Sequence, residues 1–310
     1  MGLYSAYEIV IESEIPLPEL SRSQSAPDLV VRRSHVARTP PQSGEGRKSW
    51  AENGTVWLFC CRRGALRISA GREILVDPAP GADDRIVRNW VLGQGLGIAM
   101  FQRGFLVLHS SVVRSGDHAV AFLGASGAGK STMALAFCRE GDCLVADDHA
   151  VVAEDRAPVA VLSGFPQLKL REDALRHFEA REGPVRRLRV AEEKLGWTVR
   201  ERFAPSSVPL HALYVLAEED DLCITALNLA DATSELMRHS FLASLLVKPE
   251  SAARHRRRCM ALALQVPVFR LARPRVLDGL PVLLHCVRAH AESVLCEQES
   301  NSDSRAPVPA

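Results

Sequence analysis

The sequence contains no C-x-x-C pair and no second cysteine pair at zinc-ribbon spacing, although eight cysteines are spread along its 310 residues. Closely paired cysteines are the usual ligands of structural zinc, so their absence argues against a zinc domain. Several of the cysteines lie in apolar runs, where a reduced thiol behaves as a small hydrophobic side chain. We therefore expect free thiols and a cytoplasmic location.

Long apolar runs are also missing. The most apolar stretch, residues 90–108, is interrupted by Gln94, Gln102 and Arg103 and is too polar to cross a membrane. The N-terminal residues are acidic and lack the basic segment of a signal peptide. The formal net charge of +1 creates no global field toward nucleic acid or a membrane surface. We expect a soluble protein whose partners include neither nucleic acid nor membranes.

The first part of the chain has the pattern of antiparallel strands. Residues 3–12 alternate between apolar and polar side chains, and three short apolar segments follow between residues 55 and 76, with turn residues between them. The stretch 21–50 is rich in Ser, Pro and Arg, and we expect it to be loop with one short strand at 28–32. The sequence predicts a small β-rich module over residues 1–82.

A different pattern begins at the two aspartates 83–84, which can cap a helix over residues 85–102. Three glycines in this helix are assigned to close packing, because the strand that precedes them in a dinucleotide-binding motif is missing. Buried strands follow, with further helices expected near residues 234–247 and 250–263. We predict a second domain over residues 83–296 and, because residues 297–310 show no apolar periodicity, a disordered tail.

The segment that starts at Gly124 is a complete G-x-x-x-x-G-K-S loop between an apolar strand and a helix. Its glycines let backbone N–H groups turn inward around phosphate oxygens, and the helix that begins at Lys130 adds its positive dipole end. We expect Lys130 to reach the β- and γ-phosphates of ATP and the Ser131 hydroxyl to bind Mg²⁺. The expected nucleotide-binding residues are Gly124, Ala125, Ser126, Gly127, Ala128, Gly129, Lys130, Ser131 and Thr132.

Two adjacent aspartates, Asp147 and Asp148, follow the apolar run CLVA soon after this loop. A P-loop protein needs a carboxylate at the end of a neighbouring strand to hold the metal or its water. Two carboxylates can divide the work, one as a ligand of Mg²⁺ and the other as a base for an incoming hydroxyl. The structural alternative is a turn or a helix cap, where aspartate is common.

Other polar residues are open to two interpretations. His109 ends the strand FLVL, where a lone histidine is most often a structural hydrogen-bonding group. Arg171 and Lys194 suit phosphate contacts, but a surface position explains them as well. The basic run 254–258 can dock an acidic peptide, although a solvated helix face is the simpler interpretation.

These motifs together resemble the HPr kinase/phosphorylase family, including its relatives that phosphorylate lasso-peptide precursors. The matching segments are LHSSVV, LGASGAGKSTMAL and GDCLVADD. The resemblance is good over about residues 105–171, and SEIPLPEL, FQRGFLVLHSSVV and VPVFRLARPR are similar to the peptide-kinase branch. It implies an α/β fold with a P-loop kinase core of the phosphoenolpyruvate-carboxykinase/HPr-kinase type.

The resemblance also implies roles for individual residues. It places His109 in the active site, makes Asp147 the catalytic base and lets Asp148 support the metal or the phosphate. Related enzymes form oligomers, so a homo-oligomer is possible, although no heptad pattern is present. The segment SGFPQLKLRED stands where the HPr enzymes carry a glycine-rich signature for dephosphorylation, which argues against phosphorylase activity.

The sequence thus favours an ATP- and Mg²⁺-dependent kinase that phosphorylates a serine in a peptide or protein. By resemblance, a lasso-peptide precursor is the leading candidate for the substrate. The expected catalytic residues are Asp147, His109 and Lys130, and the expected metal ligands are Ser131 and Asp148. Two alternatives remain open: a nucleotide-binding regulatory module without phosphotransfer, and a small-molecule kinase.

Overall fold

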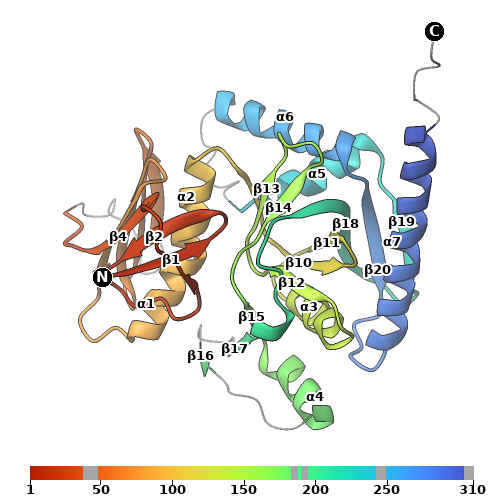
Figure 1. Ribbon diagram of the computed structural model, residues 1–310, viewed down its shortest axis with the longest axis horizontal. Helices are drawn as coiled ribbons and strands as arrows, with labels where there is room; N and C mark the ends of the chain where they lie inside the picture. Colours follow the sequence, from red (N-terminus) through yellow and green to blue (C-terminus); the bar gives the residue numbers. More distant parts are fainter. Residues whose placement is uncertain (38–47, 183–187, 190–194, 242–248, 304–310) are drawn as a thin grey trace.

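The computed structural model describes residues 1–37, 48–182, 188–189, 195–241 and 249–303. Lys194, one of the phosphate-contacting candidates, lies outside the described residues. A sheet-rich N-terminal module stands beside a larger domain of mixed strands and helices, which we call the α/β domain (Figure 1). The mixed α/β class predicted from the sequence is therefore confirmed.

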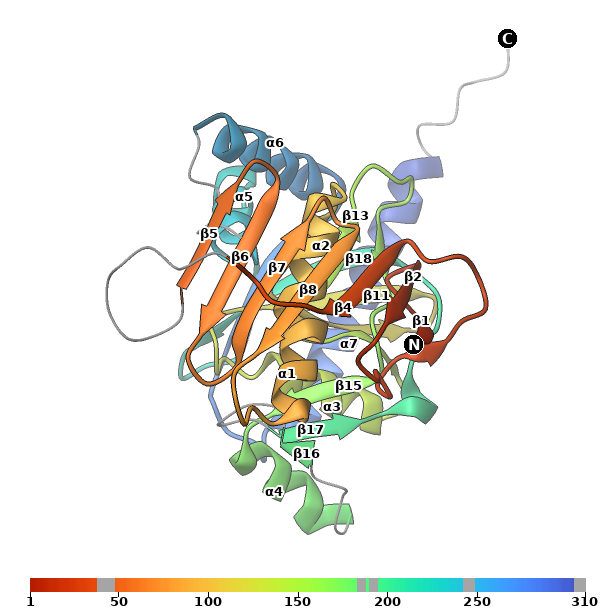
Figure 2. The ribbon, with the colours of Figure 1, turned by 90° about the vertical axis from the view of Figure 1, so that its left-hand side faces the viewer.

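The N-terminal module is built on an eight-stranded sheet in the order β3-β1-β2-β4-β8-β7-β6-β5 (Figure 2). The alternation in residues 3–12 divides into two strands, because a two-residue turn at Tyr7 and Glu8 reverses the chain. Three strands also fall wholly or partly in the stretch 21–50 that was expected to be mostly loop. The strands are β1 (Gly2–Ala6), β2 (Ile9–Ser13), β3 (Ser21–Arg22), β4 (Leu29–Arg33), β5 (Lys48–Glu52), β6 (Thr55–Cys60), β7 (Gly64–Ser69) and β8 (Glu73–Pro78).

One helical segment covers the inner face of this sheet. It comprises α1 (Asp84–Trp90), a π-helical turn η1 (Val91–Gly95) and α2 (Leu96–Gln102). The side chain of Asp83 caps it, as predicted, by accepting a hydrogen bond from the Arg85 N–H at 2.8 Å. Its apolar residues pack with the N-terminal sheet and also with β-strand residues of the α/β domain. The helix that the sequence assigned to the second domain therefore lies between the two parts (Figure 1).

The α/β domain is organised around a nine-stranded sheet in the order β12-β10-β11-β18-β14-β13-β9, with β20 beside β18 and β19 beyond β20. The central strand β18 runs parallel to both β11 and β20. The strands are β9 (Leu106–Leu108), β10 (Ser110–Ser115), β11 (His118–Leu123), β12 (Cys143–Ala146), β13 (Ala150–Ala153), β14 (Ala160–Leu162), β18 (Val208–Glu218), β19 (Cys223–Ala226) and β20 (Val268–Arg273).

Helices cover both faces of this sheet. Alternate residues of β18 point to opposite faces, so that Tyr214 joins the core beneath α3 (Lys130–Arg139) and α7 (Leu280–Asp303). Leu213 and Val215 join the core beneath α5 (Leu229–Arg238) and α6 (Pro249–Gln265). A small sheet of β15 (Gln167–Leu170), β17 (Leu195–Thr198) and β16 (Leu188–Arg189), with α4 (Glu172–Glu182) and the short 3₁₀ helix η2 (Arg200–Arg202), completes the domain.

The boundaries of two helices differ from the sequence-based expectation. The helix expected over residues 234–247 begins earlier, because the Asn228 side chain caps it by accepting from the Asp231 N–H at 3.0 Å. It ends at Arg238, and residues 242–247 of the expected range lie outside the described residues. Helix α7 continues through residues 297–303, where a disordered tail was expected, and residues 304–310 lie outside the described residues. Within the described ranges, no helix combines the length and the hydropathy needed to cross a bilayer.

Candidate active site

The glycine-rich loop connects the end of β11 to the start of α3. Three of its glycines take positive φ angles, +151° at Gly124, +85° at Gly127 and +92° at Gly129, a region that side chains with a Cβ rarely adopt. A Cβ on Gly129 would also lie 2.7 Å from a guanidinium nitrogen of Arg273. No side chain caps the N-terminus of α3, which leaves the first-turn N–H groups to face a ligand. The loop therefore fits a phosphate group.

Lys130 is buried and its ammonium group folds back over the loop. It donates to the carbonyl oxygens of Gly124 at 2.8 Å and Ala125 at 3.0 Å. Because these carbonyls belong to the turn that would enclose the phosphates, the ammonium group is held at the mouth of the anion site. Contact between Lys130 and the β- and γ-phosphates of a bound nucleotide stays a prediction.

Asp147 is the carboxylate that contacts the P-loop. Its Oδ1 accepts from the hydroxyls of Ser131 at 2.8 Å and Ser111 at 2.5 Å, and its Oδ2 accepts from the Lys169 N–H at 2.8 Å. A hydroxyl and a carboxylate oxygen side by side are a hard oxygen donor set that suits Mg²⁺. The described residues contain no group of three or more His, Cys, Asp or Glu side chains arranged as a metal site. Magnesium would therefore depend on Ser131, Asp147 and the nucleotide phosphates.

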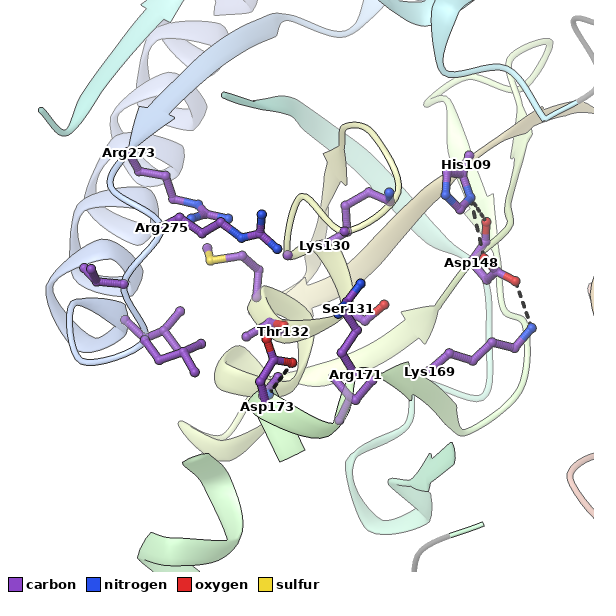
Figure 3. Close-up of a pocket in the computed structure, with 18 residues that line it drawn as sticks. His109, Lys130, Ser131, Thr132, Asp148, Lys169, Arg171, Asp173, Arg273 and Arg275 are labelled. Atoms are coloured by element: carbon purple, nitrogen blue, oxygen red, sulfur yellow. Dashed lines mark hydrogen bonds and ion pairs between the residues drawn. The ribbon is translucent and has the colours of Figure 1, made fainter. Parts of the chain in front are cut away.

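Asp148 points instead into the cavity, between His109 and Lys169 (Figure 3). Its Oδ2 lies 2.8 Å from Lys169 Nζ, and its Oδ1 lies 3.6 Å from His109 Nδ1. Burial acts to raise the pKa of this carboxyl, but the positive charge of Lys169, helped by His149 and His109, outweighs burial and holds the pKa well below its usual range. Asp148 is therefore ionised and accessible from the cavity.

The cavity itself has a volume of about 190 Å³, and its lining includes five lysine and arginine side chains together with the carboxylates of Asp148 and Asp173. Arg273 and Arg275 stand on the side of the P-loop opposite to Asp148 (Figure 3). Arg273 is held in place because it donates to the carbonyl of Ala128 at 2.6 Å. Arg171 also lines the cavity, which favours the phosphate interpretation of this residue over a plain surface role. Such a concentration of positive charge suits a polyphosphate.

The structure brings the predicted loop, both aspartates and His109 together, and adds residues that the sequence did not single out. Lys169 stands in the buried strand β15, and a buried lysine in such a strand is itself a sign of a charged partner. The arginines 273 and 275 belong to the segment VPVFRLARPR, which was noted only for its resemblance. Ser111, which donates to Asp147, is the second serine of the segment LHSSVV that begins with Leu108 and His109.

The basic run 254–258 does not join the site. It lies on α6, where His255 is buried and contacts the Ser240 hydroxyl at 2.6 Å. Arg258 pairs with Glu154 and donates to the carbonyl of Gly104 at 2.7 Å. These contacts tie α6 to the sheet and support the interpretation of this run as a helix face.

Comparison with known proteins gives little further information. No family model matches the chain, and no curated protein does. Among solved structures, the chain is similar to the HPr(Ser) kinase/phosphatase from Coxiella burnetii, with 10% sequence identity and a TM-score of 0.35. The match covers 64% of this chain and 99% of the other. A likeness of this strength carries no conclusion about mechanism, and the geometry of the site is what bears on function.

Proposed function

We propose that this protein is an ATP-dependent kinase that transfers the γ-phosphoryl group to an alcohol. The observation that carries the proposal is the contact between Ser131 of the P-loop and Asp147, with a second carboxylate, Asp148, facing the adjoining cavity. A loop with a hydroxyl and a carboxylate beside it is enough to bind a nucleotide with Mg²⁺. A second, ionised carboxylate in the cavity supplies what transfer to an acceptor requires in addition.

The hydrogen bonds favour a division of labour between the aspartates that reverses the order implied by the resemblance. Asp147 is buried and accepts three hydrogen bonds, one of them from the P-loop serine. We assign it to the metal, together with Ser131. Asp148 faces the cavity and keeps its charge because of Lys169. We assign it to the acceptor hydroxyl, which it would orient and deprotonate as the phosphoryl group moves.

The cations complete the mechanism. Lys130 and the arginines 273 and 275 would stabilise charge on the phosphate oxygens, since phosphoryl transfer depends mainly on positioning and electrostatics. Lys169 would keep Asp148 ionised. His109, whose Nδ1 lies 3.6 Å from Asp148 Oδ1, would be a second neighbour of this carboxylate. Magnesium, when bound, neutralises the β- and γ-phosphates.

For the acceptor, we propose a serine in a peptide or protein, with a lasso-peptide precursor as the leading candidate. Support comes from the resemblance of the sequence motifs, because the cavity does not by itself select one alcohol. A protein that only sensed nucleotide would need no charged carboxylate in the cavity, so the position of Asp148 favours a kinase over a regulatory module.

The proposal can be tested with labelled ATP, Mg²⁺ and a library of serine-containing peptides, with small alcohols such as glycerol and free serine as parallel acceptors. Mass spectrometry would locate the added phosphate. Phosphopeptides that disappear in Lys130→Ala support a peptide kinase, and labelling of the small alcohols alone would make it a small-molecule kinase. Tight binding of ATP with no transfer to any acceptor would favour the regulatory module and contradict the proposal.

A further inference from the structure

The turn between β1 and β2 has an unusual sequence for its geometry. Tyr7 and Glu8 form a two-residue turn between the paired residues Ala6 and Ile9, with φ angles of +53° and +59°. Turns with two positive φ angles strongly prefer Asn-Gly or similar pairs, and a bulky residue there is strained. Such a turn persists only where its surroundings hold it in place.

The contacts that hold this turn come from the α/β domain. The Tyr7 N–H donates to the Ser163 carbonyl at 2.7 Å, and the Tyr7 ring is buried edge-on against Phe165. Glu8 pairs with Arg156 at 2.7 Å. The β1–β2 hairpin therefore reaches from the N-terminal module into the α/β domain (Figure 1).

The Tyr7 hydroxyl lies beside the aspartate turn of the candidate active site. It donates to the carbonyl oxygen of His149 at 3.3 Å. The residue before, Asp148, has a φ angle of +71°, and its carbonyl oxygen is 2.9 Å from His109 Nδ1. Burial raises the pKa of Tyr7, and the charges of Asp148 and Asp147 raise it further, so the hydroxyl remains a donor. The carbonyls of Asp148 and His149, two successive residues of a strained turn, thus both have hydrogen-bonding partners. The partner of the His149 carbonyl, Tyr7, belongs to the N-terminal module.

The inner helix of the module meets the same turn from another side. A Cβ on Gly93, in the π-helical turn η1, would lie 3.3 Å from Lys169 Nζ and 3.9 Å from Asp148 Oδ2. Gly95, in the same turn, faces the N-terminal sheet, where its Cβ would lie 3.4 Å from Ile74. This turn therefore packs on the sheet with one glycine and on the Lys169–Asp148 pair with another. Such π-helical turns are frequent at functional sites.

We propose that the N-terminal module sets the geometry of Asp148, and that Tyr7 and Gly93 are positioning residues for phosphoryl transfer. Tyr7 holds the turn by donating a hydrogen bond to the His149 carbonyl. Gly93 has no side chain, which leaves the space in which Lys169 and Asp148 pair. The catalytic part of this inference rests on the proposed kinase function. The structural part, that the module holds the aspartate turn, does not.

The first arm of the test measures turnover with variants that change one contact each. Tyr7→Phe removes only the hydroxyl and should lower kcat about 3- to 10-fold, the effect of one lost hydrogen bond at the site. Gly93→Ala should shift the Lys169 ammonium group beside Asp148 by a few tenths of an ångström and lower kcat about 10-fold. The Kd for ATP should stay within about twofold in both, because neither residue touches the P-loop. Tyr4→Phe on the same hairpin and Gly95→Ala in the same turn are the matched controls and should keep kcat within about twofold.

The second arm is amide hydrogen exchange on the full chain, which does not depend on activity. Exchange at residues 147–150 should rise in Tyr7→Phe and Gly93→Ala, while exchange in the P-loop and the melting temperature stay as in the unmutated protein. Unchanged exchange at residues 147–150 would overturn the inference even if the protein is a kinase. If no acceptor is ever phosphorylated, the proposed function fails, and the exchange data alone still decide whether the module holds this turn.

Discussion

The hydroxyl of Ser131 lies 2.8 Å from Oδ1 of Asp147, so the P-loop and the paired aspartates meet through one specific hydrogen bond. Asp148, the next residue along the chain, makes its contact on the other side, with Lys169. Lys169 contacts both carboxylates, but it donates its backbone N–H to Asp147 and its ammonium group to Asp148, and of the two aspartates Asp148 is the one that lines the cavity. The following predictions depend on that separation.

Replacing Lys130 tests the anion site. Lys130→Ala should lower kcat by about 10²–10³-fold, because one preorganised cation that stabilises the transferred phosphoryl group is lost. Arg254→Ala removes an exposed cation from α6 and is the control for net charge; it should leave kcat unchanged. Near-normal phosphoryl transfer by Lys130→Ala would contradict the assignment of the loop.

The two aspartates should respond differently to substitution by asparagine. Asp148→Asn should bind ATP and Mg²⁺ normally and lose about 10²–10⁴-fold in kcat, because the group that receives the proton is neutralised. Asp147→Asn should instead require a higher Mg²⁺ concentration for half-maximal rate, measured by titrating the metal at fixed ATP. The opposite pattern would restore Asp147 as the base, as the resemblance implied.

The acid limb of the pH–rate profile should depend on Lys169, because the charge of this lysine lowers the pKa of Asp148. A base with a depressed pKa stays ionised until the pH falls through that low value, so kcat should remain independent of Asp148 protonation down to about pH 5. In Lys169→Met burial is no longer offset by the lysine charge, and the acid limb should move upward by at least about one pH unit. Arg171→Met also removes a cation from the cavity, but its charge is not among those that lower the pKa of Asp148, so its acid limb should not move.

Stability should fall at mildly acidic pH because of His239, whose carbonyl accepts from the His109 N–H at 2.7 Å. Burial, with the nearby charges of Lys130, His109 and Arg238, lowers the pKa of His239 to about 4. The unfolded chain takes up this proton near pH 6.5, so the stability that neutral His239 contributes is present above that pH and is lost between about pH 6.5 and 4.

Calorimetric scans should therefore show the melting temperature falling by roughly 2–4 °C more between pH 7 and pH 5 in the unmutated protein than in His239→Gln, the shift that about 1 kcal/mol produces in a domain of this size. His35→Gln, at an exposed histidine, serves as the control. Glu235 lies 3.3 Å from His239 on the same helix. If that carboxylate kept His239 protonated, the pH dependence would have the opposite sign.

Several parts of the fold could be predicted because their causes are local. The strand, loop and helix over residues 118–139 are contiguous in the chain, and each has a local cause. An apolar run forms the strand, glycines at positive φ form the loop, and a segment containing the helix-favouring residues Ala and Leu forms the helix. The helix cap at Asp83 is equally local. The two-residue turn at Tyr7 was missed because neither residue favours it, and only contacts with Ser163 and Arg156 make it stable.

The sequence by itself determined the conformation of the glycine-rich loop and predicted phosphate binding there, because the glycines, the lysine and the serine stand at spacings set by one stretch of backbone. It also placed two carboxylates close to that loop. Which carboxylate meets Ser131 depends on how β12 pairs with β10, where the register shifts between Val112 and Val113, and a change of one residue exchanges the faces of a strand. That choice, the burial of Lys169 beside Asp148 and the support from Tyr7 depend on contacts between distant segments, so only the tertiary structure decided them.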